Sequence, residues 1–463
     1  FDERESVSLS NENLGRILTL FERYNFTVDE SSPIDVQVAV DPEMLGKVFE
    51  ELVTGRGDSG SYYTPREIVQ FMCREALIRY LDFEGIRMPK LRALVYHYSD
   101  ENLTVAEART LLQRLTEIRV VDPACGSGAY LLGILQELTI LTGILDTRAQ
   151  NAAKEIFDRK LAIIQANLYG VDKDKFAVQI ARLRLWLSLA IDFTGDEPQP
   201  LPNLDFKIEC GDSLTAPDPS RANLDGVADQ IEQYRKAKAK FFDASIRVPH
   251  DKEYREGLLE EVKRLHDEIS FWVHANQNAR APEDAFDWAI EFAEVFQTND
   301  GGGSGFDVVL ANPPYGAKVG DNVRDLYFDR AREGSQSKDT YGLFMARGLQ
   351  LLRKGGILSY IVSDTWRTIK SHLPLRRRIL EQSKVHHFLD LPPWVFDATV
   401  NTCILTLTKQ PPTEDNNVLA GDLRNLPVRN WRMLEDNLRV VSGHGFDAQT
   451  LDYARYTYPQ RAI

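Results

Sequence analysis

The chain has 463 residues, of which 43% are hydrophobic and 27% charged, a composition that is typical of globular proteins and excludes collagen-like, disordered and disulfide-scaffold classes. Lys and Arg number 55 against 69 Asp and Glu, and the formal net charge is -14. This balance argues against a surface evenly coated for nucleic acid but leaves room for a local basic cleft. The length predicts two or three structural units.

The four cysteines form no CxxC pair and the eight histidines no HxxxH or HExxH pattern. These spacings predict neither a disulfide framework nor a metal site, and they suit a reducing cytoplasm. The longest apolar stretch, residues 120–145, is interrupted by Asp122 and Glu137, and no signal-peptide pattern is present, so we expect no membrane segment. Phe1 in place of Met suggests a piece of a longer polypeptide.

The first part of the chain is helical in pattern. Residues 1–60 carry apolar positions at helical spacing up to the glycine-rich break at 55–60. A further helix is expected after Thr64 and Pro65, because Thr is a favourable N-cap, Pro suits the first turn, and Glu67 has the spacing of a capping box.

From residue 120 onward, short apolar runs alternate with helical patterns. This alternation predicts an α/β protein with a mostly parallel sheet. The expected strands lie at 119–121, 168–171, 206–208, 306–310 and 356–362. The polar, charged segment 217–305 predicts a helical insertion into this sheet domain.

The first expected strand ends in a tight glycine loop, which contains Asp122, Pro123, Ala124, Gly126 and Gly128. Glycines let the backbone approach a ligand closely, and doubly wound sheets bind nucleotide-like ligands at such turns. No lysine ends the loop, which disfavours a phosphate-binding P-loop. Taken alone, an ordinary turn between a strand and a helix is as good an interpretation.

Acidic residues follow the next two strands. Asp172 is placed to accept hydrogen bonds from the two hydroxyls of a ribose, and Asp212 from an adenine amino group. Each could equally cap a helix or face solvent. Three neighbouring strand ends, one glycine-rich and two acidic, together predict a nucleoside site.

The fourth strand ends in Asn312, Pro313, Pro314 and Tyr315. Prolines stiffen the turn and have no N–H with which to engage nearby carbonyls. The Asn312 side-chain oxygen and the Pro313 carbonyl could then both accept hydrogens from one exocyclic amino group, while Tyr315 offers a flat face for a flipped base. An ordinary Asn-Pro turn is the alternative interpretation.

The order of Tyr62-Tyr63-Thr64-Pro65, the loop at 122–128 and the motif at 312–315 resembles the gamma subgroup of amino DNA methyltransferases, which modify adenine at N6. The resemblance covers roughly residues 40–410 and is greatest to the methylase region of type IIG restriction-modification enzymes, with phage-defence methylases as relatives. It implies a Rossmann-like class I methyltransferase sheet that uses S-adenosyl-L-methionine, in a cytoplasmic protein of a bacterium or archaeon.

The resemblance also implies a role for each motif residue. Tyr63 and Thr64 would approach the methionine part of the cofactor, the 122–128 loop would wrap it, Asp172 would hold its ribose and Asp212 its adenine. Phe396 would sandwich the flipped adenine against Tyr315, and a core phenylalanine is its alternative interpretation.

The expected partner is double-stranded DNA with a flipped adenine, with a target-recognition domain after this region and a nuclease before it in a full-length chain. The expected divisions are a connector at 1–60, the cofactor-binding half at 61–216, the insertion at 217–305, the catalytic half at 306–410 and the start of a target-recognition region at 411–463. The densest basic segment, 366–378, lies after a predicted strand end and could track phosphate or be a solvated helix face.

Three alternatives stay open. Asn-Pro-Pro-Tyr also suits methylation of a protein glutamine or an RNA guanine. The modification subunit of a type I restriction complex is closer, although those subunits usually end the motif in Phe. The third alternative is a cofactor-sensing DNA-binding module that controls a separate nuclease. The ExK pattern at 261–263 lies in a charged helical segment and is interpreted as surface, not as a nuclease site.

Overall fold

The computed structural model describes residues 15, 16, 19, 64–83, 85–193, 204–219, 224–247, 251–276, 286–297, 304–315, 339–396, 400–414, 416–427, 430–441 and 455–459. Tyr63, and all but residues 15, 16 and 19 of the connector predicted at 1–60, lie outside these described residues.

Nine strands form one sheet in the order β3-β2-β1-β4-β5-β7-β6-β8-β9. Their bounds are β1 Val120–Asp122, β2 Leu168–Asp172, β3 Ile208–Cys210, β4 Phe306–Ala311, β5 Leu352–Ser363, β6 Lys384–Asp390, β7 Thr402–Thr408, β8 Asn417–Asp422 and β9 Arg455–Pro459. Strands β1 to β5 pair in parallel, whereas β7 runs antiparallel to both β5 and β6. The predicted Rossmann-like α/β sheet is confirmed.

The direction of winding reverses between β1 and β4. The chain moves outward from β1 through β2 to β3 and then returns to β4 on the other side of β1. Ligands of doubly wound sheets bind outside the carboxyl ends of the strands at such a switch point. The glycine loop follows β1, and Asn312 follows β4, so the topology places both motifs at this point.

Helices cover both faces of the sheet, because the buried strands alternate their apolar side chains between two separate clusters. One face is covered by α4 Arg66–Leu81, α5 Met88–His97, α6 Val105–Glu117, α7 Ala129–Arg148, α8 Ile156–Asn167, α9 Lys175–Ala190 and α17 Trp431–Val441. The other is covered by α10 Ala228–Arg247, α11 Lys252–Asn276, α12 Trp288–Glu291, α13 Ala293–Phe296, α15 Thr340–Leu351 and α16 Leu373–Gln382.

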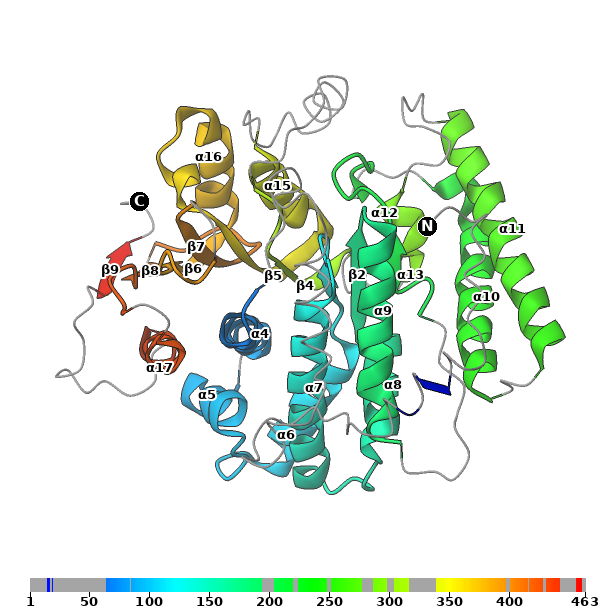
Figure 1. Cartoon of the computed structure of the whole chain (residues 1–463), viewed down its shortest axis with the longest axis horizontal. Coiled ribbons are helices and arrows are strands. Elements are labelled where there is room, and N and C mark those ends of the chain that lie inside the picture. Colours follow the sequence, from blue (N-terminus) through cyan, green and yellow to red (C-terminus); the bar gives the residue numbers. More distant parts are fainter. Residues whose placement is uncertain are drawn as a thin grey trace.

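The segment expected to be an insertion supplies much of the second layer. Helices α10 and α11 pack against each other at the right of Figure 1, beside α12 and α13. Trp288 and Phe292 meet Phe306 of β4 in edge-to-face ring contacts, with ring centroids 6.3 and 6.0 Å away. The segment is therefore part of the core and buries one face of the sheet.

Helix α7 is the one helix among the described residues whose length and composition would allow it to cross a membrane. It packs against α4, α6 and α8 and contributes Leu138 and Leu141, both fully buried, to the cluster on its face of the sheet. Its apolar character is that of a core helix.

The sheet continues past the division expected at residue 410. Strand β8 pairs in parallel with β6, and α17 packs against α4 (Figure 1). No boundary of the sheet coincides with residue 410.

Candidate active site

Backbone conformation shapes the loop after β1. Gly126 and Gly128 have φ of 50° and 87°, a left-handed region that L side chains rarely adopt. A Cβ on Gly128 would lie 3.1 Å from the Cβ of Ala181, so this glycine also lets α7 begin close against α9. The Cys125 N–H donates to the Val171 carbonyl at 3.0 Å, which ties the loop to β2.

Two carboxylates, the buried Asp122 and the half-buried Asp172, organise the ends of β1 and β2. Asp122 accepts from the Ala124 N–H at 3.0 Å, and Asp172 accepts from the N–H groups of Gly126 at 2.8 Å and Asp174 at 2.9 Å. Burial raises the pKa of both carboxyls, and for Asp172 the two N–H donors oppose that rise. Asp172 therefore joins the glycine loop to the second strand tip.

The end of β3 closes the same region. Asp212 accepts from the Leu214 N–H at 2.9 Å, and the Ser213 hydroxyl donates to the Pro123 carbonyl at 2.5 Å. The Phe286 ring packs so closely on Gly211 that a Cβ there would lie 2.4 Å from it. The structure thus brings all three predicted strand tips together.

Asn312, directly after β4, is held at both ends of its amide. Its Nδ2 donates to the Thr64 hydroxyl at 3.1 Å, and its Oδ1 accepts from the Tyr315 hydroxyl at 2.5 Å. Asn312 is partly exposed, whereas Thr64 and Tyr315 are 4% and 5% exposed. Residues from the start of α4 and from the motif itself therefore orient this amide.

The capping box predicted for Thr64 and Glu67 is wrong. Pro65 is the N-cap of α4, and no side chain caps that helix. Thr64 precedes this N-cap, and its hydroxyl accepts instead from Asn312, 248 residues later in the chain.

Two residues that sequence reasoning missed complete the surroundings of the motif. Thr340, at the start of α15, donates its hydroxyl hydrogen to the Pro314 carbonyl at 2.6 Å. Burial and nearby Asp122 raise the pKa of Tyr130, and a hydrogen bond from Thr64 opposes that rise. Tyr130 lies two residues after the predicted glycine loop, but its aromatic ring indicates only a helix core.

The predicted partner of Tyr315 lies elsewhere. Phe396 is 4% exposed and packs in the cluster on the α4 face of the sheet, whereas Tyr315 belongs to the cluster on the opposite face. The structure does not bring these two rings together, so the sandwich of a flipped base between them stays a prediction.

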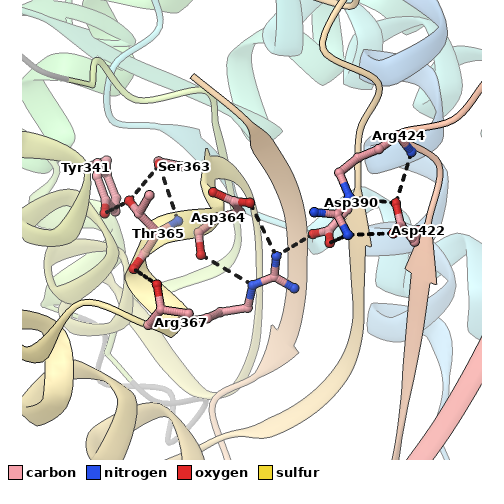
Figure 2. A network of polar contacts seen from close by, with 9 residues as sticks. Tyr341, Ser363, Asp364, Thr365, Arg367, Asp390, Asp422 and Arg424 are labelled. Carbon is pink, nitrogen blue, oxygen red and sulfur yellow. Dashed lines mark hydrogen bonds and ion pairs between the residues drawn. The ribbon is translucent and has the colours of Figure 1, made fainter. Parts of the chain in front are cut away.

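A polar network lies farther along the same edge of the sheet. Figure 2 shows Asp390, which ends β6, between Arg367 of the short helix η4 (Asp364–Arg367) and Arg424, with nitrogen-to-oxygen distances of 2.6 and 3.8 Å. Arg424 also pairs with Asp422, which ends β8, at 2.5 Å. These ion pairs fix the turns that follow β5, β6 and β8.

The basic segment is partly used by the fold. The Arg376 Nη1 donates to the carbonyls of Trp366 at 2.6 Å and Ile369 at 2.7 Å. Lys370 and Arg377 are exposed. Two cations of this segment are therefore accessible at the edge of the sheet that carries Asn312.

Residues 166–396 match the Eco57I restriction-modification methylase family, and residues 98–198 match the DNA-methyltransferase domain of MmeI. Residues 98–396 form a methyltransferase domain of the restriction-modification type. Among the described residues, no group of three His, Cys, Asp or Glu side chains could hold a metal ion.

Relatives that are similar to this domain in sequence are also described as methyltransferases. The putative type II restriction enzyme and methyltransferase RM.MjaORFECS2P of Methanocaldococcus jannaschii is 27% identical over 88% of this chain and 41% of its own length. The adenine-specific methyltransferase PglX of Streptomyces coelicolor is 27% identical over 50% of this chain and 20% of its own. The type II restriction enzyme and methyltransferase RM.Eco57I of Escherichia coli is 23% identical over 63% and 24%. The chain spans less than half the length of each of these relatives.

S-adenosylmethionine is the methyl donor of this class, and the residues at the switch point fit it. The Asp172 carboxylate lies beside the glycine loop, where it can take ribose hydroxyls, and Asp212 adds an acceptor for an amino group. The fit rests on this set of acceptors and on the left-handed glycines beside them.

Proposed function

We propose that the chain transfers the methyl group of S-adenosylmethionine to N6 of an adenine that is flipped out of double-stranded DNA. The observation that carries this proposal is the Asn312 amide, held beside the cofactor loop by Thr64 and Tyr315 with its oxygen directed to the tyrosine. An amide oxygen next to a methyl-donor site is suited to a substrate that carries an exocyclic amino group.

In this proposal the protein orients the adenine amino group and polarises it. The N6 lone pair of adenine is conjugated with the ring and is therefore a poor nucleophile. When Asn312 Oδ1 and the Pro313 carbonyl accept the two amino hydrogens, the lone pair is drawn toward the direction of attack. The bound cofactor supplies the methyl group as a sulfonium. Thr340 fixes the Pro314 carbonyl and so stiffens the turn that presents these acceptors.

Tyr315 orients Asn312 through its hydroxyl, and its ring is proposed to support the flipped base. Phe396 is proposed as a second base contact only if its segment moves, since it is now packed in the core. We further propose a role in restriction-modification or phage defence, with target-recognition and nuclease regions outside these residues.

Methylation of DNA by the full-length protein tests the proposal. Tritiated methyl transfer from S-adenosylmethionine to adenine-containing duplexes is expected, and sequencing should locate N6-methyladenine. Asn312→Ala should lower the rate of methyl transfer at least roughly 100-fold, because it removes the oxygen that accepts a hydrogen bond from the adenine amino group in the transition state. The affinity for the cofactor should stay unchanged. Undiminished transfer by this variant, or methyl groups found only on cytosine, RNA or protein, would overturn the proposal.

A further inference from the structure

We propose that Arg347 is a positioning residue, which holds the turn after β3 in place for the cofactor and makes α15 the spacer between the two reactants. This inference rests on the proposed function, because it assigns the cofactor to the strand tips beside Asp212 and the adenine amino group to the motif at Asn312. Arg347 lies on α15, seven residues after Thr340, whose hydroxyl holds the Pro314 carbonyl.

The Arg347 guanidinium donates to three backbone carbonyls of the segment that follows Asp212. Its Nη2 donates to the Leu214 carbonyl at 3.0 Å and the Ala216 carbonyl at 2.5 Å, and its Nη1 donates to the Pro217 carbonyl at 3.0 Å. Arg347 is 6% exposed, so water cannot readily replace these bonds if the side chain is removed. One side chain therefore fixes the backbone from 214 to 217.

The turn held by Arg347 belongs to the region proposed to bind the cofactor. Asp212, the proposed acceptor for the adenine amino group of the cofactor, accepts from the Leu214 N–H, and the carbonyl of that same Leu214 accepts from Arg347. Ser213 joins the turn to the glycine loop by donating to the Pro123 carbonyl. A displacement of this turn would therefore move Asp212 and disturb the glycine loop together.

Helix α15 connects this turn to the motif after β4. Thr340 and Arg347 leave the helix on the same side, because seven residues are nearly two full turns, roughly 10 Å along the axis. The helix packs closely on β5 (Figure 1): a Cβ on Gly348 would lie 2.7 Å from both Leu358 Cδ1 and the Tyr360 hydroxyl oxygen. A helix fixed in this way sets the distance between the two turns, and methyl transfer is slow when donor and acceptor are misplaced.

Cofactor binding to the full-length protein tests the role of Arg347 directly. In Arg347→Met the side chain keeps much of its length but loses all three hydrogen bonds. Titration calorimetry should show at least a roughly 10-fold loss of affinity for S-adenosylmethionine. The loss should be the same for S-adenosylhomocysteine, because both ligands carry the adenosine that the turn would hold.

Arg347→Lys keeps the charge but not the forked set of donors, so its affinity should lie between those of the wild type and Arg347→Met. Wild-type affinity for both ligands in Arg347→Met, or in Arg347→Lys where Arg347→Met does not fold, overturns the inference. A loss of affinity that is confined to S-adenosylmethionine also overturns it, since the turn would then act on the methyl end of the ligand.

The opposite pattern is expected at the other end of α15. Thr340→Val should lower kcat for adenine methylation roughly 10-fold and leave the affinity for S-adenosylmethionine within about 2-fold, because it frees only the Pro314 carbonyl. Thr340→Ser should restore kcat because serine keeps the hydroxyl. Equal losses of cofactor affinity in Thr340→Val and Arg347→Met, or failure of Thr340→Ser to exceed Thr340→Val in kcat, would show that α15 is only a core helix.

The matched control is Arg148→Met. The Arg148 Nε also donates to a backbone carbonyl, that of Leu103, at 2.8 Å. Arg148 is the last residue of the 20-residue helix α7, so roughly 30 Å of helix separates it from the glycine loop. The variant should unfold at a lower temperature and keep the wild-type cofactor affinity and kcat. An affinity as low as that of Arg347→Met would make the effect of Arg347 a general loss of stability.

A second measurement needs neither cofactor nor activity. Hydrogen exchange of the backbone N–H groups at 212–217 in the cofactor-free protein should become faster in Arg347→Met and stay unchanged in Arg148→Met. Unchanged exchange in both variants overturns the role of Arg347. A wild-type protein that binds S-adenosylmethionine but methylates no adenine overturns only the proposed function, because the affinity and exchange results do not depend on the methyl acceptor.

Discussion

The Asp172 carboxylate braces the glycine loop, and we propose that the same carboxylate also holds the ribose of the cofactor. Its oxygens accept from the N–H groups of Gly126 and Asp174, at 2.8 and 2.9 Å. Asp174, two residues later, is the N-cap of α9, and its carboxylate accepts from the Phe176 and Ala177 N–H groups.

This contrast gives a matched pair of variants. Asp172→Ala should weaken S-adenosylmethionine binding roughly 10-fold or more, because the loop brace and the ribose acceptor are lost together. Asp174→Ala should cost about 1 kcal/mol of stability through loss of a helix cap and should leave cofactor affinity unchanged. Titration calorimetry and thermal unfolding separate the two effects, and equal losses of affinity would contradict the role given to Asp172.

Single-residue positions are predictable where a motif gives both the residue and its place at a strand end. Asn312, Asp172 and the two loop glycines belong to that group. Thr64 was placed correctly near the site, but its bond to Asn312 depends on a contact across 248 residues that no local pattern encodes. Met72 and Tyr130 have ordinary core patterns, and the hydrogen bond between them becomes visible only in three dimensions.

At the scale of elements, charged side chains bind the α10–α11 hairpin to the rest of the second layer. The Lys238 ammonium donates to the Glu291 carbonyl at 2.6 Å and pairs with Glu294 at 3.2 Å. His266 of α11 lies 2.7 Å from the Glu291 carboxylate. Burial raises the pKa of Glu209, on the neighbouring edge strand β3, to about 7.

These groups make stability depend on pH. Burial lowers the pKa of His266, but hydrogen bonds and charge from Glu291 and Asp267 outweigh that effect and raise it to about 9, above the ordinary 6.5. The charged imidazole therefore stabilises the fold fully below pH 6.5, and this contribution is lost as pH rises through 9. Glu209 also lowers the stability as pH rises, because its pKa in the folded protein, about 7, is above the ordinary value of 4.5. Its contribution is lost as pH rises toward 7.

We expect the thermal midpoint to fall between pH 6.5 and 9. His266→Gln should remove most of the fall that arises in this window, a contribution of about 1–2 kcal/mol once the partial exposure of the ring is allowed for. His97→Gln, at an exposed histidine of α5, is the control and should keep the wild-type profile. A profile for His266→Gln as steep as that of the wild type would show that this pair does not control the stability.

Element types were predicted better than their connections. Each of the five expected strands from 119 to 362 overlaps one of β1 to β5, since apolar runs between helical patterns are a strong local signal, although the strand expected at 206–208 shares only Ile208 with β3. The insertion was predicted as helical, but its burial against Phe306 was not, because acidic and aromatic residues mixed along α12 and α13 give no clear period.

At the scale of the whole molecule, the net charge of -14 opposes approach to DNA, so the proposed contact with DNA would rely on local cations. Lys370 and Arg377 are exposed near the edge that carries Asn312. Replacing both with Gln should reduce the slope of log affinity against log salt by about 2, as expected for two lost phosphate contacts.

The control for this double variant lies on the insertion hairpin. Lys236 and Lys252 have side chains that are 68% and 80% exposed, and replacing both with Gln changes the net charge equally. Their loss should leave the slope unchanged. If the two double variants have equal slopes of log affinity against log salt, Lys370 and Arg377 do not contact phosphate and are ordinary solvated surface residues.

The continuation of the sheet through β8 has a practical consequence for protein engineering. The proposed target-recognition region after this part of the chain would be the segment to exchange with that of a relative in order to redirect the enzyme to new DNA sequences. A junction at residue 410 would cut away β8 and α17, bare the hydrogen-bonding edge of β6 and remove Arg424 from Asp390. Chimeras joined after β9 keep the edge of β6 covered by β8. They also retain the sheet relative to which an exchanged recognition segment would have to be positioned so that DNA reaches the candidate active site.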